Sequence, residues 1–275
     1  MNQEQWGAKA AGILGRVRRT KPLVHHITNL VVMNETANIT LCAGGLPVMA
    51  HADAEVEEMV AAAGALVLNI GTLTPELVET MLKAGAKANS LGIPIVLDPV
   101  GAGATRLRTE SAAKILERLD VAIVRANAAE AAVLAGLDAE IRGVESIGGV
   151  APDVAAASLA RRYGCVTAVT GAIDFISDGK RTVAVTNGTP MMATVTGTGC
   201  MASAVVALFA AVEDDKVAAT AGALAAYGLA GFVAAHTAKG PGSFHVGLYD
   251  AVAGLTEDAL RVGARINDEP TDAPA

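Results

Sequence analysis

Short apolar runs alternate with longer segments of helical periodicity along much of the chain. Apolar runs bounded by turn-forming residues are typical of strands that are buried on both faces of a sheet. Such strands are expected at residues 65–70, 93–97, 121–124 and 166–170. Helices are expected around them at residues 75–90, 109–119, 128–135 and 152–163. Strands that alternate with helices predict an α/β fold, in which a mostly parallel central sheet is covered by helices on both faces.

The pattern changes after Gly171. Two short alternating runs flank Asp178-Gly179, which predicts a β-hairpin with a type I′ turn and therefore a short antiparallel edge on the sheet. Three long alanine-rich helices are expected next, at about residues 200–212, 217–238 and 242–261. The tail, about residues 266–275, is polar and is expected to be disordered. No linker or repeat interrupts the sequence, so residues 1–275 are predicted to form a single domain.

Composition narrows the class of protein. The 275 residues are 52% hydrophobic and only 3% aromatic, so we expect a large core of small aliphatic side chains and not a disordered chain. The formal net charge of −7 argues against a nucleic-acid partner. The three cysteines are far apart and lack CxxC spacing, which disfavours a disulfide framework or a zinc site and fits a reducing compartment. The N-terminal segment lacks the apolar stretch of a signal peptide, and a cytoplasmic protein is expected.

One uncharged segment, residues 217–235, is nearly long enough to cross a bilayer. It consists mainly of alanine and glycine, with few leucines or isoleucines. A helix that is apolar all round is also what the core of a large protein requires. We therefore expect a buried helix and no membrane partner.

Polar residues at the ends of the predicted strands are the first candidates for chemistry, because ligands of parallel sheets bind beyond the carboxyl ends of the strands. Asp98 could hold Mg²⁺ directly or through water, or could cap the loop that follows. Arg125 suits a phosphate group. Glu130 by itself fits a capping box with Asn127, but beside Asp98 it is also a candidate for the cation. The Thr170 hydroxyl could bind a nucleotide phosphate or could serve only the turn.

The most specific motif is Gly197-Thr198-Gly199-Cys200, where an extended run gives way to an apolar helix. The glycines permit backbone conformations that other residues avoid, and the helix directs its free N–H groups toward the loop. The motif therefore predicts an anion site suited to a phosphoryl group in transfer. At this position the helix dipole is expected to lower the pKa of the Cys200 thiol. The alternative is a small residue that merely fits the packing.

A further set of polar residues lies nearer the N-terminus. A metal site there would need a third ligand at suitable spacing, and the sequence offers none. Polar tips beside methionine and valine could instead line a pocket for a small heteroaromatic alcohol, although each residue taken singly also fits helix capping or core packing. The residues concerned are His25, His26, Thr28, Asn29, Asn34, Glu35, Met49 and His51.

Taken in order, these motifs resemble the hydroxyethylthiazole kinases of thiamin salvage. The similarity runs from about residue 21 to the third C-terminal helix. It implies a ribokinase-like fold and a homotrimer that phosphorylates the hydroxyl of 4-methyl-5-(2-hydroxyethyl)thiazole with Mg-ATP. The segments that carry it are "HHITNLVVMNETAN", "GGLPVMA", "LNIGTL", "LDPVGAGATRLRT", "RANAAE", "VTGAIDFISDG" and "VTGTGCMASAV".

The resemblance also implies roles for individual residues. Cys200 stands where other ribokinase-like kinases usually carry an aspartate as general base, and it should face the substrate hydroxyl. One departure is Ala126, where the family more often has glycine. The implied contacts are Asn29, Met49 and Gly197 for the thiazole, Arg125, Thr170 and Gly199 for ATP, and Asp98 and Glu130 for magnesium.

Three alternatives remain at this stage. Another ribokinase-like enzyme, such as a pyridoxal or pyrimidine kinase or a nicotinamide-hydrate dehydratase, would typically keep an aspartate at the position of Cys200. A non-catalytic nucleotide-binding module would bind ATP without releasing ADP in response to an alcohol. A redox sensor based on Cys200 would need a resolving thiol, which the sequence does not nominate.

Overall fold

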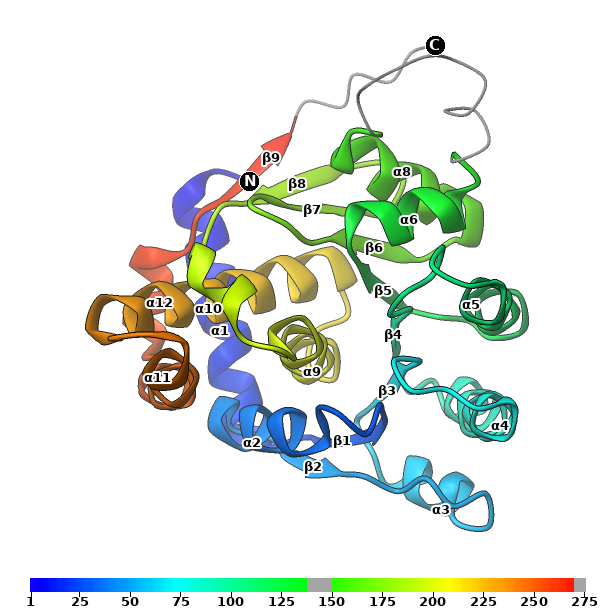
Figure 1. Ribbon diagram of the computed structural model, residues 1–275. Helices are drawn as coiled ribbons and strands as arrows, with labels where there is room; N and C mark the ends of the chain where they lie inside the picture. Colours follow the sequence, from blue (N-terminus) through cyan, green and yellow to red (C-terminus); the bar gives the residue numbers. More distant parts are fainter. Residues whose placement is uncertain (138–149, 270–275) are drawn as a thin grey trace.

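A nine-stranded sheet forms the centre of the computed structural model, which describes residues 1–137 and 150–269 (Figure 1). The strand order is β2-β1-β3-β4-β5-β6-β7-β8-β9. Strands β1 to β6 pair in parallel, and β7, β8 and β9 add an antiparallel edge. The bounds are β1 Leu23–Ile27, β2 Leu46–Val48, β3 Ala65–Asn69, β4 Ile95–Asp98, β5 Ile123–Ala126, β6 Val166–Val169, β7 Asp174–Ser177, β8 Thr182–Val185 and β9 Ile266–Glu269.

Helices cover both faces of this sheet, which confirms the predicted α/β architecture (Figure 1). One face carries α1 Gln3–Thr20, α2 Met33–Ala43, α9 Thr198–Ala210 and α10 Lys216–Thr237, with α11 Pro241–Gly254 and α12 Glu257–Gly263 packed outside them. The other face carries α3 Val56–Ala61, α4 Pro75–Ser90, α5 Arg106–Arg118, α6 Ala128–Ala135 and α8 Pro152–Tyr163. A short 3₁₀ helix, η1 Pro190–Thr194, precedes α9.

Strand β3 shows how the sequence places one sheet between two layers of helices. Ala65 and Val67 contribute to the core beneath α9 and α10, whereas Leu66 and Leu68 contribute to the core beneath α4. Successive side chains of a strand point to opposite faces, so a strand that is covered on both faces must be apolar at every position. This is why the strands appear in the sequence as continuous apolar runs.

Helix α10 is the uncharged segment that raised the question of a membrane. It is long and apolar enough to cross one, but 83% of its most apolar window is buried inside the protein. It packs against α1, α9 and α11, and its small side chains allow these close contacts. The expectation of a buried core helix is confirmed.

Helices α4 and α6, each of which begins at a polar cap, have the expected bounds. Thr74 accepts a hydrogen bond from the backbone of Leu77 at the start of α4, and Asn127 caps α6 in the same way. Helix α5 begins three residues earlier than expected, because Thr105 caps it. The single helix predicted over residues 242–261 is wrong: α11 ends at Gly254, and Thr256 starts α12 by accepting a hydrogen bond from the N–H of Ala259.

The predicted hairpin is present as β7 and β8, but its turn is not of type I′. That turn requires positive φ at both central residues, and of the pair Asp178-Gly179 only Gly179 has it, with φ of 85°. The Asp178 carboxylate instead accepts hydrogen bonds from the N–H groups of Lys180 and Arg181, each at 2.9 Å. The side chain therefore organises a longer loop.

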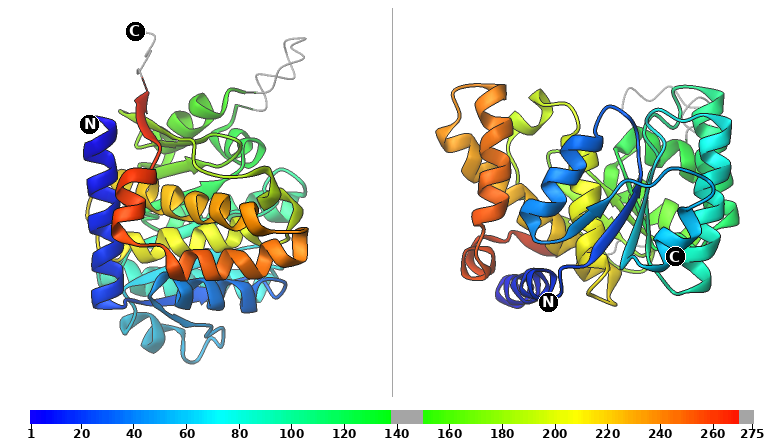
Figure 2. Two further views of the ribbon diagram at one scale, coloured as in Figure 1. Left: turned by 90° about the vertical axis from the view of Figure 1, so that its left-hand side faces the viewer. Right: turned by 90° about the horizontal axis from the view of Figure 1, so that it is seen from below.

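The expectation of a disordered tail is wrong for residues 266–269, which form β9 and pair with β8. Ile266 is buried, and Asp268 accepts hydrogen bonds from the N-terminal amine and from Trp6 Nε1, the latter at 2.9 Å. The final strand and the first helix, α1, therefore lie side by side (Figure 2). Residues 270–275 lie outside the described residues.

Candidate active site

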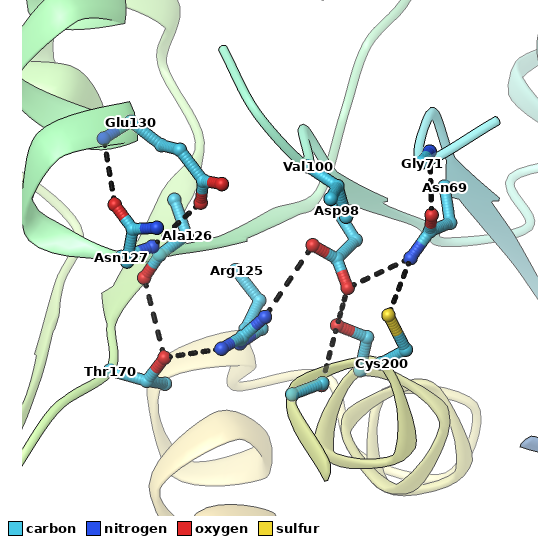
Figure 3. Close-up of polar contacts among 12 residues, drawn as sticks. Asn69, Gly71, Asp98, Val100, Arg125, Ala126, Asn127, Glu130, Thr170 and Cys200 are labelled. Atoms are coloured by element: carbon cyan, nitrogen blue, oxygen red, sulfur yellow. Dashed lines mark hydrogen bonds and ion pairs between the residues drawn. The ribbon is translucent and has the colours of Figure 1, made fainter. Parts of the chain in front are cut away.

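The carboxyl ends of β3, β4, β5 and β6 bring a row of polar side chains together (Figure 3). Asn69 ends β3, and its register partner Asp98 ends β4. Arg125 lies in β5, and Thr170 directly follows β6. The first turn of α9 faces this row. These positions confirm the prediction that Asp98, Arg125 and Thr170 lie together at the carboxyl ends of the strands.

Asp98 is the most buried carboxylate of the row, with no exposed surface. Its Oδ2 accepts hydrogen bonds from Asn69 Nδ2 at 3.0 Å and from Ser203 Oγ at 2.8 Å. Its Oδ1 lies 3.5 Å from Arg125 Nη1. A buried charge must be paired and hydrogen-bonded to be tolerated, and these three donors meet that need.

The guanidinium of Arg125 is only partly hydrogen-bonded. Its Nη2 donates to Thr170 Oγ1 at 2.6 Å, while its buried Nε has no hydrogen-bond partner among the described residues. Gly199 lies directly beside it: a Cβ at that position would be 2.8 Å from both Nη atoms, so any side chain there would displace the guanidinium. The structure thus brings together Arg125, Thr170 and Gly199, and leaves guanidinium donors for an oxyanion.

The N-terminus of α9 has the geometry of an anion site. Its N-cap, Gly197, adopts a left-handed conformation with φ of 88°, and a side chain there would clash with Val32. Tyr227 braces the first turn by donating to the carbonyl of Thr198 at 3.1 Å. The first N–H groups of a helix have no partner within the helix and lie at the positive end of its dipole. The first turn can therefore bind an anionic group.

Cys200 is the third residue of α9, and its thiol meets the amide row. Its Sγ accepts from Asn69 Nδ2 at 3.2 Å and from Asn29 Nδ2 at 3.6 Å. Burial, followed by the charge of Asp98, raises the pKa of this thiol to about 12. The expectation that the helix dipole lowers it is wrong, because burial and the carboxylate outweigh the dipole and the amide donors. Cys200 is a neutral thiol at physiological pH.

A cavity of about 620 Å³ opens beside Arg125 and continues along the backbone that follows β8. This volume is in the range of small-molecule and cofactor sites. Asp174 and Asn187 also line it, and burial raises the pKa of Asp174 to about 6. Neither residue follows a parallel strand, which is the position that marks candidate ligand-binding residues in the sequence. Asp174 begins the hairpin strand β7, and Asn187 follows β8.

The other end of the row lies near the predicted thiazole contacts. Asn29 follows β1, is buried, and donates to Asn69 Oδ1 at 2.8 Å. Met49 directly follows β2, which pairs with β1. Met49 is therefore placed on the neighbouring strand end and not in the hydrogen-bonded row itself.

Glu130 forms the capping box that the sequence suggested as an alternative to a metal role. Its Oε2 accepts from the N–H of Asn127 at 2.9 Å, and its Oε1 accepts from the N–H of Gly101 at 2.8 Å. It therefore fixes the loop that follows Asp98. Each carboxylate oxygen has further lone pairs, so this cap does not consume the acceptor capacity of Glu130.

Within residues 1–137 and 150–269, no group of three or more His, Cys, Asp or Glu side chains could hold a metal ion. Mg²⁺, however, is usually bound by one or two carboxylates together with substrate phosphates and water. Asp98 ends β4 and Glu130 lies in the first turn of α6, and two carboxylates near the Arg125 guanidinium fit that kind of site.

The fold is of the ribokinase-like class. A ribokinase-like superfamily protein from Enterococcus faecalis V583 shares this fold, with a TM-score of 0.61 over 93% of this chain and 83% of that chain at 14% identity. Residues 14–258 match the hydroxyethylthiazole kinase family, and the chain belongs to this family.

Two relatives show how close the similarity is. A hydroxyethylthiazole kinase of Desulforudis audaxviator (strain MP104C) is 55% identical over 267 residues, covering 97% of this chain and 98% of the relative. The structure of a hydroxyethylthiazole kinase protein from Pyrococcus horikoshii OT3 is 45% identical with a TM-score of 0.87, covering 94% of this chain and 98% of that chain. The chain is thus an enzyme, a kinase of this family.

Proposed function

We propose that this enzyme transfers the γ-phosphoryl group of Mg-ATP to the hydroxyl of 4-methyl-5-(2-hydroxyethyl)thiazole, which yields the thiazole phosphate used to make thiamin diphosphate. One observation carries the proposal: the first turn of α9 separates a phosphate side from an acceptor side. Arg125 and Gly199 lie on the first, and Cys200 with Asn29 lies on the second. The names of the relatives support the choice of substrate.

On the phosphate side, the 620 Å³ cavity receives the nucleotide. Arg125 and Thr170 hold phosphate oxygens at the cavity's inner end, and the N–H groups around Gly199 face the group in transfer. Phosphoryl transfer depends mainly on positioning and on the stabilisation of charge. Donors that are fixed before the substrate arrives supply both.

Asp98 and Glu130 would hold the magnesium ion of Mg-ATP, which would neutralise charge that develops on the phosphates. Asp98 is oriented for this by Asn69 and Ser203, which hold its Oδ2. Glu130 is oriented by the backbone of Asn127 and Gly101. These contacts fix both carboxylates before the cation is bound.

On the acceptor side, Asn29, Met49 and Gly197 contact the thiazole alcohol, and Cys200 faces its hydroxyl. Because the thiol is neutral, Cys200 orients the substrate hydroxyl before the transfer. It does not act as a thiolate base that removes the hydroxyl proton. A loose transition state demands little deprotonation of the acceptor. As the bond from the hydroxyl oxygen to phosphorus forms and the bond to the ADP oxygen breaks, the hydroxyl proton leaves late, to a phosphoryl oxygen or to solvent, so no strong base is needed at this position.

The proposal includes a cytoplasmic homotrimer without nucleic-acid or membrane partners. Leu30 is 75% exposed and Val31 is 61% exposed, directly after Asn29 of the acceptor side. Large apolar side chains that lie exposed beside a polar site are typical of a surface covered by another protein chain. In this assembly each acceptor side would lie at a subunit boundary.

The test is ADP release from ATP with a panel of small alcohols. We expect release to be fastest with hydroxyethylthiazole, and slow with pyridoxal, with hydroxymethylpyrimidine and without any alcohol. Equal rates with the three alcohols would contradict the substrate assignment. ATP binding without alcohol-dependent release would indicate a nucleotide-binding module instead.

A further inference from the structure

Asn69 uses every hydrogen-bonding position of its side chain. Its Nδ2 donates to Asp98 Oδ2 at 3.0 Å and to Cys200 Sγ at 3.2 Å (Figure 3). Its Oδ1 accepts from the N–H of Gly71 at 2.9 Å and from Asn29 Nδ2 at 2.8 Å. An amide side chain offers two donors and an acceptor oxygen with two lone pairs. All four are occupied here.

These partners fix which way the amide points. The opposite orientation would place its carbonyl oxygen against the Asp98 carboxylate and its N–H groups against the N–H of Gly71. Each of those contacts would join two acceptors or two donors, which cannot hydrogen-bond. The donating edge of Asn69 must therefore face Asp98 and Cys200.

The donating edge closes a ring of contacts between three elements. Asn69 of β3 holds Asp98 of β4 and Cys200 of α9, while Ser203 of α9 donates to the same Asp98 oxygen at 2.8 Å. Cys200 and Ser203 are three residues apart, so they lie on one face of the helix. Asn69 and Ser203 are both buried, and solvent does not compete for these bonds. The first turn of α9 is thus tied to two strand ends.

We propose that Asn69 is a positioning residue for phosphoryl transfer, which sets the separation of the Asp98 carboxylate from the Cys200 thiol and thereby aims the first turn of α9. This inference rests on the proposed function and extends it to a residue that contacts neither substrate. Asn69 acts through the two groups it holds. Reacting groups must be held close to the productive geometry, and a misplacement of about 1 Å can lower a rate about a hundredfold.

The substitution Asn69→Asp separates the two edges of the side chain. Aspartate has almost the same shape and still accepts from Gly71 and Asn29, but it presents an oxygen to Asp98 and Cys200. Asn69→Ala removes both edges and serves as a second variant if the aspartate variant does not fold. Asn89→Ala is the matched control, because Asn89 makes two hydrogen bonds to the backbone of Asp120, which precedes the amino end of β5, opposite the strand ends that form the site.

We expect kcat for thiazole-dependent ADP release to fall about tenfold to a hundredfold in both Asn69 variants, with KM for ATP changed less than about threefold. Asn89→Ala should lower the unfolding midpoint and leave kcat at the wild-type value. The double variant Asn69→Ala/Cys200→Ala should lose less kcat than the product of the two single fold-losses, because the effects of substitutions at contacting residues are not additive.

Three results would overturn the inference: wild-type kcat in Asn69→Asp, a rise in KM for ATP at constant kcat, or a double variant that shows the full product. A wild-type enzyme without thiazole-dependent release would contradict the proposed function instead. The unfolding midpoints of wild type, Asn69→Ala, Cys200→Ala and the double variant then test the ring of contacts. The ring is supported if the midpoint of the double variant falls by less than the sum of the two single decreases. A decrease equal to that sum overturns it.

Discussion

Thr170 Oγ1 accepts a hydrogen bond from Arg125 Nη2 at 2.6 Å, and Arg125 Nη1 lies 3.5 Å from Asp98 Oδ1, whereas the buried Nε of the same guanidinium has no hydrogen-bond partner among the described residues. Unpaired buried donors are rare in folded proteins. Arg125 also lines the 620 Å³ cavity, and in the function proposed above its guanidinium binds phosphate oxygens of the nucleotide.

Arg125→Lys should raise KM for ATP about tenfold to a hundredfold, because lysine keeps the charge but loses the planar fork and a charge-assisted hydrogen bond contributes about 1.5–3 kcal/mol. Steady-state kinetics with varied ATP checks this. Arg106→Lys, at an exposed ion pair on α5, is the control and should match wild type. An unchanged KM in Arg125→Lys would remove Arg125 from the nucleotide site.

Glu130→Gln separates the metal role from the cap. If Glu130 serves the cation, the magnesium concentration for half-maximal rate should rise. A lost cap alone should cost about 1 kcal/mol of stability and leave the magnesium dependence unchanged. A magnesium titration together with urea unfolding measures both, and an unmoved titration midpoint would leave Glu130 with a structural role only.

Cys200→Ala should lower kcat about tenfold to a hundredfold. This lies at or below the low end of the usual worth of a general base, about 10²–10⁴, because the transition state needs little deprotonation. Cys200→Asp should keep substantial activity, and Cys42→Ala in α2 should behave as wild type. Inactive Cys200 variants together with a phosphocysteine trapped by mass spectrometry would indicate covalent catalysis. A wild-type rate in Cys200→Ala would reduce the residue to packing.

His26 should make the protein less stable in mild acid. It is fully buried, and burial, with the neighbouring His25 and His51, lowers its pKa to about 3 from 6.5. The unfolded chain therefore binds a proton that the folded chain refuses, and stability falls as the pH drops from about 6.5 toward 3.

Between pH 7 and pH 5 this residue alone should account for about 2 kcal/mol of lost stability. In urea unfolding at these two pH values, His26→Gln should show a smaller loss than wild type, and the exposed His236→Gln should not. Burial also lowers the pKa of His25, so some pH dependence should persist in the variant. Identical pH dependence in wild type and His26→Gln would show that His26 has the same pKa in the folded and unfolded chain, which would contradict the lowered value.

Assembly is predicted to depend on the exposed apolar residues after β1. Leu30→Asp should prevent formation of the proposed trimer, because a carboxylate would then be buried in the interface. Light scattering coupled to gel filtration gives the mass, and Leu91→Asp at the end of α4, on the other face of the sheet, is the control. A wild-type monomer with full activity would refute the assembly.

Sequence patterns predicted the parts of the fold that depend on local rules. Helices α4, α6 and α8 have the expected bounds because polar caps or an early proline mark where they begin. Asp98, Arg125 and Thr170 lie together because the ends of neighbouring parallel strands must meet. Strand β9 was missed because it is a polar edge strand that buries little beyond Ile266.

The missing parts of the site depend on contacts between distant residues. Ser203 lies within an apolar helix and bonds Asp98, which is 105 residues away in the chain, so no local pattern marks it. Asn69 was not predicted as a site residue because the apolar run continues to Ile70, so the predicted strand extends past Asn69 and does not place it at a strand end. The predicted direction of the Cys200 pKa shift was wrong because the effects of burial and of Asp98 depend on the tertiary structure.

The pairing of α1 with β9 has a consequence for synthesis. The N-terminal amine and Trp6 both bond to Asp268, and α1 packs against α12 and β9. Helix α1 thus leaves the ribosome long before α12 and β9, and the part of its surface that they cover stays uncovered while the residues between them are translated. Contacts of such long sequence separation slow folding. Unfinished chains of this protein are therefore the species most in need of chaperones.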